Sequence, residues 1–211
     1  MLQNSDHLKP RKTPTQSRSA YTVDTIQQAT IQVLLSEGAE NLTTTKVAER
    51  AGVSVGTLYQ YFGDKTSLLS SVTEKHLLNV ANSVELACEQ QQGKPIAAMT
   101  ESLIDSFFSA KFADRETSQA LYAIASQVEG NDMAMKLLQR TQQQICHMLA
   151  SASDIKITDP ITTTFVITTI MMGPVQTLLT INAPSVFCEK IKGELTAMVK
   201  TYLANQSKYP C

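Results

Sequence analysis

Apolar residues recur at helical spacing along most of the chain after residue 20. In the first such segment they stand three or four positions apart, apart from one adjacent pair: Val23, Ile26, Ala29, Val33 and Leu34. This spacing is typical of one face of an α-helix. Thr22 is placed to cap the N-terminus of this helix, and Gly38 is placed to end it.

The same pattern predicts helices almost to the end of the chain. After two very short helices between residues 43 and 63, further helices are predicted over 65–92, 95–112, 114–128, 132–152, 160–182 and 185–204. Residues 162–172 are rich in β-branched side chains and resemble a strand locally, but no second strand is predicted to pair with them. Pro174 is expected to bend its helix because it removes a backbone donor. The sequence therefore predicts an all-α fold of about nine helices.

The two short helices and the turn between them have the pattern of a helix-turn-helix. Thr43 or Thr44 can cap the first helix and Ser54 the second, and Gly52 lies where the turn needs a positive φ. Small and apolar residues supply the buried face of the pair: Val47, Ala48, Ala51, Val53 and Leu58. Four other side chains are then predicted to point outward: Thr57, Tyr59, Gln60 and Tyr61.

Outward hydroxyl groups and an amide on a short helix suit the major groove of DNA. Hydroxyl groups hold phosphates, and glutamine can read adenine through two hydrogen bonds. The alternative is an ordinary α-hairpin whose exposed residues are solvated. Periodicity alone leaves both interpretations open.

The segment LTTTKVAERAGVSVGTLYQYFGDKTSLL resembles the DNA-binding region of the TetR family of bacterial transcriptional regulators. The resemblance spans roughly residues 18–72 and rests on a Thr pair, an Ala-x-x-x-Gly-Val turn, the run Gly-Thr-Leu-Tyr-x-Tyr-Phe and a Lys three residues later. It implies a three-helix DNA-binding domain at 21–65 and a helical ligand-sensing and dimerisation domain at 66–211. Repression of transcription is the usual mode of this family. Residues 1–20 are polar and contain two Pro, which predicts a flexible basic arm.

The resemblance also implies which residues meet DNA. Phosphate contacts are implied at Thr44, Thr57, Tyr59 and Lys65, and base contacts at Val55, Gly56, Gln60 and Tyr61. Since Thr45 and Val55 are short, we expect Gln60 and the shape of the DNA to carry more of the discrimination. The full predicted set is Arg18, Thr44, Thr45, Lys46, Ser54, Val55, Gly56, Thr57, Tyr59, Gln60, Tyr61 and Lys65.

The basic arm has two interpretations. The formal net charge of the whole chain is only −1, but Lys9, Arg11, Lys12 and Arg18 gather within the first 18 residues. Such an arm can reach phosphates or a minor groove, or it can be a solvated tail. Arg18, next to the first helix, is the best candidate for DNA contact.

An effector pocket is predicted in the C-terminal domain, where apolar and soft side chains recur. The candidate residues are Phe107, Phe108, Phe112, Tyr122, Met133, Met148, Thr168, Met171, Met172 and Gln176. Methionine adapts to varied ligands, although such residues are also common in an ordinary core. No charged residue lies between Asp159 and Glu189, which favours a neutral or hydrophobic effector if this helix lines the pocket.

The same uncharged stretch is the best candidate for a dimer interface. The last two helices, about 160–204, are predicted to pair with their copies in a four-helix bundle, which relates the two recognition helices by a two-fold axis. Such a dimer needs a near-palindromic double-stranded DNA operator. A membrane span over 160–181 is the alternative, but the apolar runs there are short and interrupted.

Other classes of function find little support. The sequence contains no HExxH and no phosphate-cradling glycine loop, and the adjacent Cys146 and His147 point about 100° apart on a helix. We expect no enzyme activity, no cofactor and no metal site. The four cysteines lack metal or CxxC spacing, and the missing leader suggests a cytoplasmic protein. A regulator switched by oxidation of Cys188 or Cys211 is the alternative function.

Overall fold

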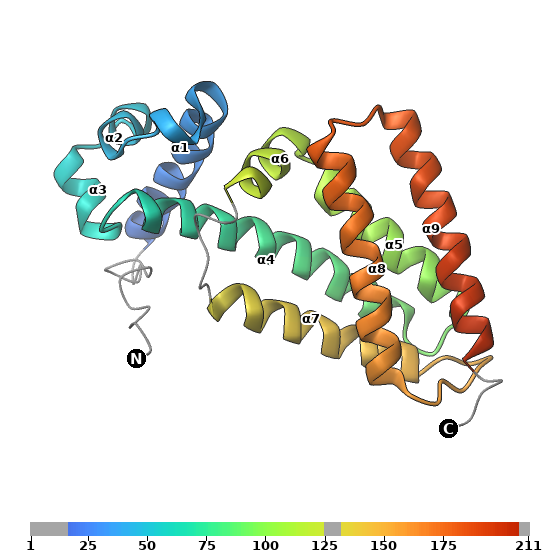
Figure 1. Ribbon diagram of the computed structural model, residues 1–211. Helices are drawn as coiled ribbons and strands as arrows, with labels where there is room; N and C mark the ends of the chain where they lie inside the picture. Colours follow the sequence, from blue (N-terminus) through green and yellow to red (C-terminus); the bar gives the residue numbers. More distant parts are fainter. Residues whose placement is uncertain (1–16, 125–131, 207–211) are drawn as a thin grey trace, which may run out of the picture. The chain divides into compact units, whose positions relative to one another are not determined.

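The computed structural model describes residues 17–124 and 132–206 of the 211-residue chain. The described part contains nine helices and no strand, which confirms the predicted all-α fold (Figure 1). The helices are α1 (Ser17–Asn41), α2 (Thr44–Ala51), α3 (Val55–Tyr61), α4 (Lys65–Gln91), α5 (Ile96–Phe112), α6 (Arg115–Ala123), α7 (Asp132–Ala150), α8 (Pro160–Thr180) and α9 (Ser185–Asn205). The predicted continuation of the 114–128 helix beyond residue 124 lies outside the described residues.

The first helix departs from the prediction at its start. Helix α1 begins at Ser17, so Thr22 lies inside the helix and the prediction that it caps the N-terminus was wrong. Residues 17–21 contain neither Gly nor Pro, and nothing in them stops the helix from extending backwards. The predicted break at Gly38 is confirmed, because this residue has a φ of 78° that glycine tolerates and other residues rarely adopt.

Most of the predicted caps are confirmed. The Thr43 side chain accepts a hydrogen bond from the Lys46 N–H at the start of α2, and Ser54 accepts one from the Thr57 N–H at the start of α3. Two further residues also act as caps: Asp64 accepts from the Ser67 N–H, and Asp159 accepts from the Thr162 N–H. Each such cap satisfies an orphaned donor and contributes about 1 kcal/mol. The hydrogen bonds from Thr162 also lower the pKa of the Asp159 carboxyl.

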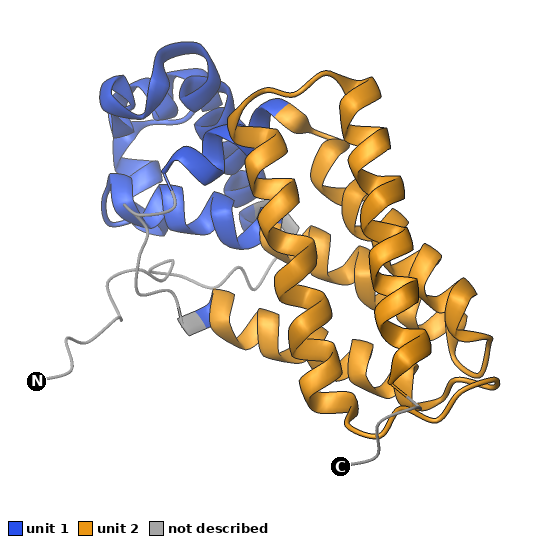
Figure 2. Cartoon of the chain, turned by 45° about the vertical axis from the view of Figure 1, so that its right-hand side comes forward, with its two compact units in different colours: residues 1–76, 116–133 blue, residues 77–115, 134–211 orange. Residues whose placement is uncertain are grey.

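The chain divides into two compact units (Figure 2). Unit 1 comprises residues 1–76 and 116–133, and unit 2 comprises residues 77–115 and 134–211. This division differs from the predicted boundary at residue 65. The reason is the core of unit 1, which includes residues from the first turns of α4 and from α6: Leu68, Leu69, Val72, Leu121 and Ile124.

In unit 2, α5 and α8 both pack against α9. Helix α8 remains helical through its β-branched run, as predicted, because its buried residues recur at helical spacing: Thr164, Ile167, Thr168, Met171, Val175 and Leu178. Pro174 lies inside this helix. By length and composition α8 would also suffice to cross a membrane, with 33% of its most apolar window buried. A helix that faces the core or another subunit has the same composition.

Candidate nucleic-acid interface

Helices α2 and α3 are held together by a short turn and a shared apolar face. Gly52 ends α2 with a φ of 66°, and its N–H donates to carbonyl oxygens of the last turn of α2. Val47, Ala48 and Leu58 are buried in the core of unit 1, and Ala51 and Val53 are packed against it. This arrangement is the helix-turn-helix that the sequence predicts, and it fixes which side of α3 faces outward.

The outward side of α3 is narrower than predicted. Tyr59 is 41% exposed, and Gln60 is exposed as well. Tyr61, in contrast, is partly buried and packs against the core of unit 1, as does Val55. These two residues stand three positions from Leu58 on either side, so they share the inward face of the helix with it.

Hydroxyl groups form two pairs on the outward side. Thr44 Oγ1, at the first residue of α2, lies 3.1 Å from the Tyr59 hydroxyl oxygen on α3. The hydroxyl oxygens of Ser54 and Thr57 lie 2.8 Å apart at the start of α3. All four side chains are at least partly exposed. Hydroxyl groups held in fixed positions on one surface can bind phosphate oxygens.

The two predicted lysines contact the end of α1. The Lys46 ammonium pairs with the Glu37 carboxylate and donates to the Asn41 carbonyl at 3.0 Å. The Lys65 ammonium donates to the Ala39 carbonyl. Both lysines therefore stabilise the segment that follows the break at Gly38, and a DNA phosphate would have to compete with these contacts.

The other predicted DNA-binding residues fall into two groups. Thr45, Ser54 and Gly56 are exposed on or next to the two helices. Arg18 belongs to α1 rather than to an arm, because α1 begins at Ser17; its side chain and residues 1–16 lie outside the description.

The predicted effector residues are divided between the two units. Tyr122 and Met133 belong to unit 1, and the other eight belong to unit 2. Phe108, Met148, Thr168 and Met171 are buried; Phe107, Phe112 and Tyr122 are partly buried; Met133, Met172 and Gln176 are exposed. The Phe108 and Phe112 rings stack with centroids 5.7 Å apart. Burial raises the pKa of Tyr122.

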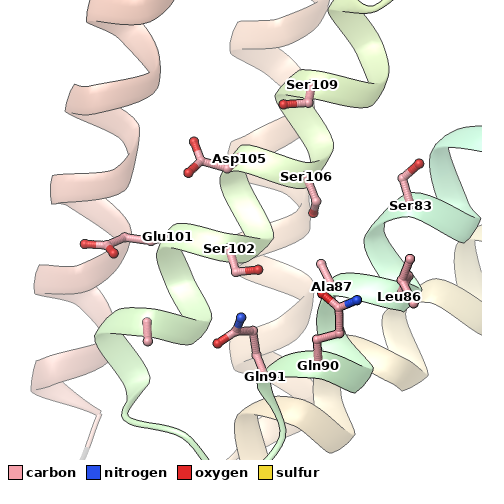
Figure 3. A pocket seen from close by; sticks show the side chains of 11 residues that line it. Ser83, Leu86, Ala87, Gln90, Gln91, Glu101, Ser102, Asp105, Ser106 and Ser109 are labelled. Carbon is pink, nitrogen blue, oxygen red and sulfur yellow. The ribbon is translucent and has the colours of Figure 1, made fainter.

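An open groove in unit 2 was not predicted. It lies between α4 and α5 and has a volume of about 570 Å³ (Figure 3). Its lining is mostly polar: Ser83, Leu86, Ala87, Gln90, Gln91, Ala98, Glu101, Ser102, Asp105, Ser106 and Ser109. None of the ten predicted pocket residues is among them. Small polar residues on a helix look solvated in a sequence, so no pattern distinguished this groove.

The two acidic groups that line the groove each have an ion-pair partner on α9. Glu101 pairs with Lys200 of α9, and Asp105 pairs with Lys192 at 3.2 Å. These pairs join α5 to α9, and Lys192 also pairs with Glu189 at 2.8 Å.

The cysteines give the redox alternative no support in the described residues. Cys188 is 6% exposed, and its thiol donates to the Ala183 carbonyl at 3.6 Å. Burial raises the pKa of the Cys88 thiol to about 12. A sensor thiol needs exposure and a low pKa, and Cys211 lies outside the described residues. No group of three or more metal-ligating side chains occurs within the described ranges.

Two family descriptions match the chain. Residues 26–72 match "Bacterial regulatory proteins, tetR family", and residues 95–203 match "Tetracyclin repressor-like, C-terminal domain". The second match alone covers more than half of the chain. The first match contains the helix-turn-helix with its exposed hydroxyl pairs.

Individual proteins agree with these matches. The chain is 26% identical over 130 residues to the HTH-type transcriptional regulator BetI of Vibrio atlanticus, covering 61% of this chain and 64% of that protein. It is 26% identical over 113 residues to the HTH-type transcriptional repressor BepR of Brucella suis, covering 54% of this chain and 53% of that protein. The chain thus spans between about half and two thirds of these curated relatives. The solved SmeT–triclosan complex is similar in fold, with a TM-score of 0.63, 18% identity and coverage of 87% of this chain and 90% of that one.

The helix-turn-helix geometry and the two family matches lead to the same conclusion. Proteins of this kind bind DNA and regulate transcription, and they are not enzymes. The chain belongs to the TetR family of bacterial regulators.

Proposed function

We propose that this chain is a repressor that binds a near-palindromic operator as a homodimer and leaves it when a small effector binds. The observation that carries the proposal is the outward surface of α2 and α3. There, Thr44 and Tyr59 present one hydroxyl pair and Ser54 and Thr57 present another. Two pairs fixed on a rigid helix pair suit two or more phosphates of a DNA backbone.

Sequence discrimination would come from the few side chains that remain free to meet bases. Gln60 is exposed on α3 and can form two hydrogen bonds to adenine. Gly56 is also exposed and allows close approach. Because Val55 and Tyr61 are partly buried, the shape and deformability of the operator would carry the remaining discrimination.

Helices α8 and α9 support the proposed dimer. They pack against each other, lie side by side in Figure 1, and expose large apolar side chains: Ile161, Phe165, Met172, Val186, Phe187 and Met198. Val186 is 84% exposed and Ile161 is 77% exposed. A single exposed apolar residue is ordinary, but six on two neighbouring helices are typical of an interaction surface. For such a dimer to bind one operator, its two recognition helices would need to lie about 34–36 Å apart, one turn of DNA.

The effector would act through the helices that belong to both units. Helix α4 runs without interruption from Lys65 to Gln91, and the boundary between the units falls at residue 76. An effector releases DNA only if it binds the DNA-incompetent state more tightly than the competent one. The SmeT–triclosan complex shows a protein of similar fold with a small apolar molecule, and the name of BepR describes a repressor. A hydrophobic effector is consistent with this mechanism of release. The mechanism also requires that the protein act in the cytoplasm.

Fluorescence anisotropy tests the proposed function. The probe is the intergenic DNA beside the gene for this chain, measured at two salt concentrations against random DNA of equal length. We expect tight, salt-sensitive binding by the wild type, since released counterions drive the association. The Tyr59→Ala variant should lose this tight, salt-sensitive binding. Equal binding of both DNAs by the wild type, or unchanged binding by Tyr59→Ala, contradicts the proposal.

A further inference from the structure

Arg115, the first residue of α6, has an unusual environment. Its Nε and Nη2 atoms are buried, and neither has a hydrogen-bond partner among the described residues. Buried polar atoms are paired in more than about 90% of cases. A guanidinium has five N–H donors and no acceptor, and two of the donor atoms of Arg115 are orphaned.

The two orphaned atoms form one functional edge. The N–H groups of Nε and Nη2 lie on the same side of the planar guanidinium and point in nearly the same direction. This edge matches the two oxygens of a carboxylate, which it binds through two parallel hydrogen bonds. The orphaned Thr164 Oγ1 in the same unit is less informative, since a hydroxyl can rotate toward a nearby carbonyl.

An aromatic surface lies beside this edge. The Arg115 guanidinium carbon lies 5.8 Å from the centroid of the Phe112 ring, and Phe112 stacks on Phe108 at 18° between ring planes. The Phe112 ring contacts the guanidinium through a cation–π interaction. An apolar molecule that carries a carboxylate therefore finds an apolar and a cationic partner side by side.

Unit 2 also buries a lysine, which is a base like Arg115. Lys111, on the last turn of α5, is 4% exposed, and burial lowers the pKa of its ammonium to about 8. The described residues that are buried include no Asp or Glu. The argument for an anion therefore rests on the orphaned edge of Arg115, and Lys111 adds only that a buried ionisable side chain of this unit is a base.

We propose that the effector carries a carboxylate on an apolar body, and that the Nε and Nη2 edge of Arg115 binds its two oxygens. This proposal rests on the proposed function, because it names the chemical class of the effector. The sequence predicted a neutral or hydrophobic effector from the uncharged α8. Under the present proposal, that prediction applies only to the apolar body of the effector. The effector binds the conformational state in which its carboxylate can reach the Nε and Nη2 edge of Arg115.

Side-chain NMR tests the proposal directly. Formate, octanoate and phenylacetate are each titrated into the full chain, and the Arg115 Nε–H resonance is followed. The corresponding primary amides are titrated separately as uncharged controls. We expect the carboxylates to shift this resonance and the amides to leave it in place. In Arg115→Gln, carboxylate affinity measured by calorimetry should fall about tenfold to a hundredfold, because two charge-assisted hydrogen bonds are lost. If no carboxylate shifts the resonance, or amides bind as well, the proposal is overturned.

Arg140→Gln is the matched control. Arg140 also lies in unit 2, but its nitrogens already donate to Glu85 at 2.9 Å and Asn82 at 3.0 Å. Its substitution should leave carboxylate affinity within about twofold, since surface pairs contribute little. An equal loss in Arg140→Gln and Arg115→Gln would overturn the assignment to Arg115.

A stability comparison guards against a purely structural role of Arg115. Replacing an orphaned buried donor by an apolar side chain of similar length is expected to be neutral or stabilising. Arg115→Met should therefore keep or raise the melting temperature of the free protein, and a clear fall would indicate a structural role instead. Operator binding by the wild type without carboxylate is measured in parallel. Its absence would refute the proposed function, whatever the carboxylates do.

Discussion

The Thr44 side-chain oxygen lies 3.1 Å from the Tyr59 hydroxyl oxygen and joins the start of α2 to the middle of α3. One hydrogen bond thereby sets the position of two hydroxyl groups that belong to different helices. Because the pair is exposed, it can exchange its partners for phosphate oxygens without leaving a buried group unpaired.

Removal of either hydroxyl should weaken DNA binding more than folding. For Tyr59→Phe and Thr44→Val we expect the free energy of unfolding to change by less than about 1 kcal/mol, since the bond is exposed. Operator affinity should fall about tenfold to a hundredfold, because hydrogen bonds to charged oxygens contribute about 1.5–3 kcal/mol each. Chemical denaturation and fluorescence anisotropy measure the two effects.

The double variant adds a check on the shared bond. Two residues that position each other should show losses that do not add. Strict additivity of the two affinity losses would mean that Thr44 and Tyr59 act independently.

Two substitutions at Ser54 should separate the cap from the DNA contact. The Ser54 side chain accepts from the Thr57 N–H at 3.0 Å. Ser54→Ala removes this cap and should lower the free energy of unfolding by about 1 kcal/mol. Ser54→Asp keeps a capping oxygen and the stability, but its negative charge should repel phosphates and abolish operator binding. Operator binding by Ser54→Asp at wild-type affinity would place this end of α3 away from DNA.

Much of the fold follows from local signals in the sequence. Caps such as Thr43 and Ser54, and the glycines at the α1 break and the α2–α3 turn, are determined by nearby backbone geometry. The periodic apolar face then sets which side of each helix is buried. These signals lie within a few residues of one another, which is why they can be read from one sequence.

The features that escaped prediction depend on residues far apart in the chain. Leu121 joins the core of unit 1 although it stands more than fifty residues after Phe62, and no periodicity reveals that pairing. The contacts of Lys46 and Lys65 with the end of α1 depend on tertiary packing, and their contacts with DNA stay predictions. The orphaned edge of Arg115 likewise becomes visible only when its surroundings are known.

An acidic substitution on α8 should disrupt the proposed dimer. Phe165 is 61% exposed, so Phe165→Glu should fold normally as a monomer while placing two like charges near the two-fold axis. Sedimentation should show a monomer, and operator affinity should fall at least tenfold because both half-sites are no longer bound together. Leu86→Glu is the control, since Leu86 is similarly exposed at 54% on α4. Equal effects of both variants would argue against an interface on α8.

Burial of Lys111 should make stability depend on alkaline pH. Its pKa is lowered from 10.5 to about 8 by desolvation. Between these values the unfolded chain holds a proton that the folded chain has lost, so the free energy of unfolding rises with pH through this window. The gain approaches about 3 kcal/mol.

Lys111→Met isolates this effect from other groups. Cys88, whose pKa is raised to about 12, should lower stability over part of the same range, but it contributes equally to both proteins. Denaturation at a series of pH values should therefore show the wild type gaining on the variant between about pH 8 and 10.5. If the difference in free energy of unfolding between the two proteins stays constant across this window, burial does not lower the pKa of Lys111.

Selection from a random DNA library tests the central claim most directly, because it does not depend on where the operator lies in a genome. The purified full chain is incubated with the library, and bound DNA is recovered, amplified and sequenced over several rounds. The account predicts an enriched sequence with two-fold symmetry and half-sites one helical turn apart, with no enrichment by Tyr59→Ala. A folded wild-type protein that enriches no sequence, or an enriched sequence that Tyr59→Ala recovers equally, would contradict it.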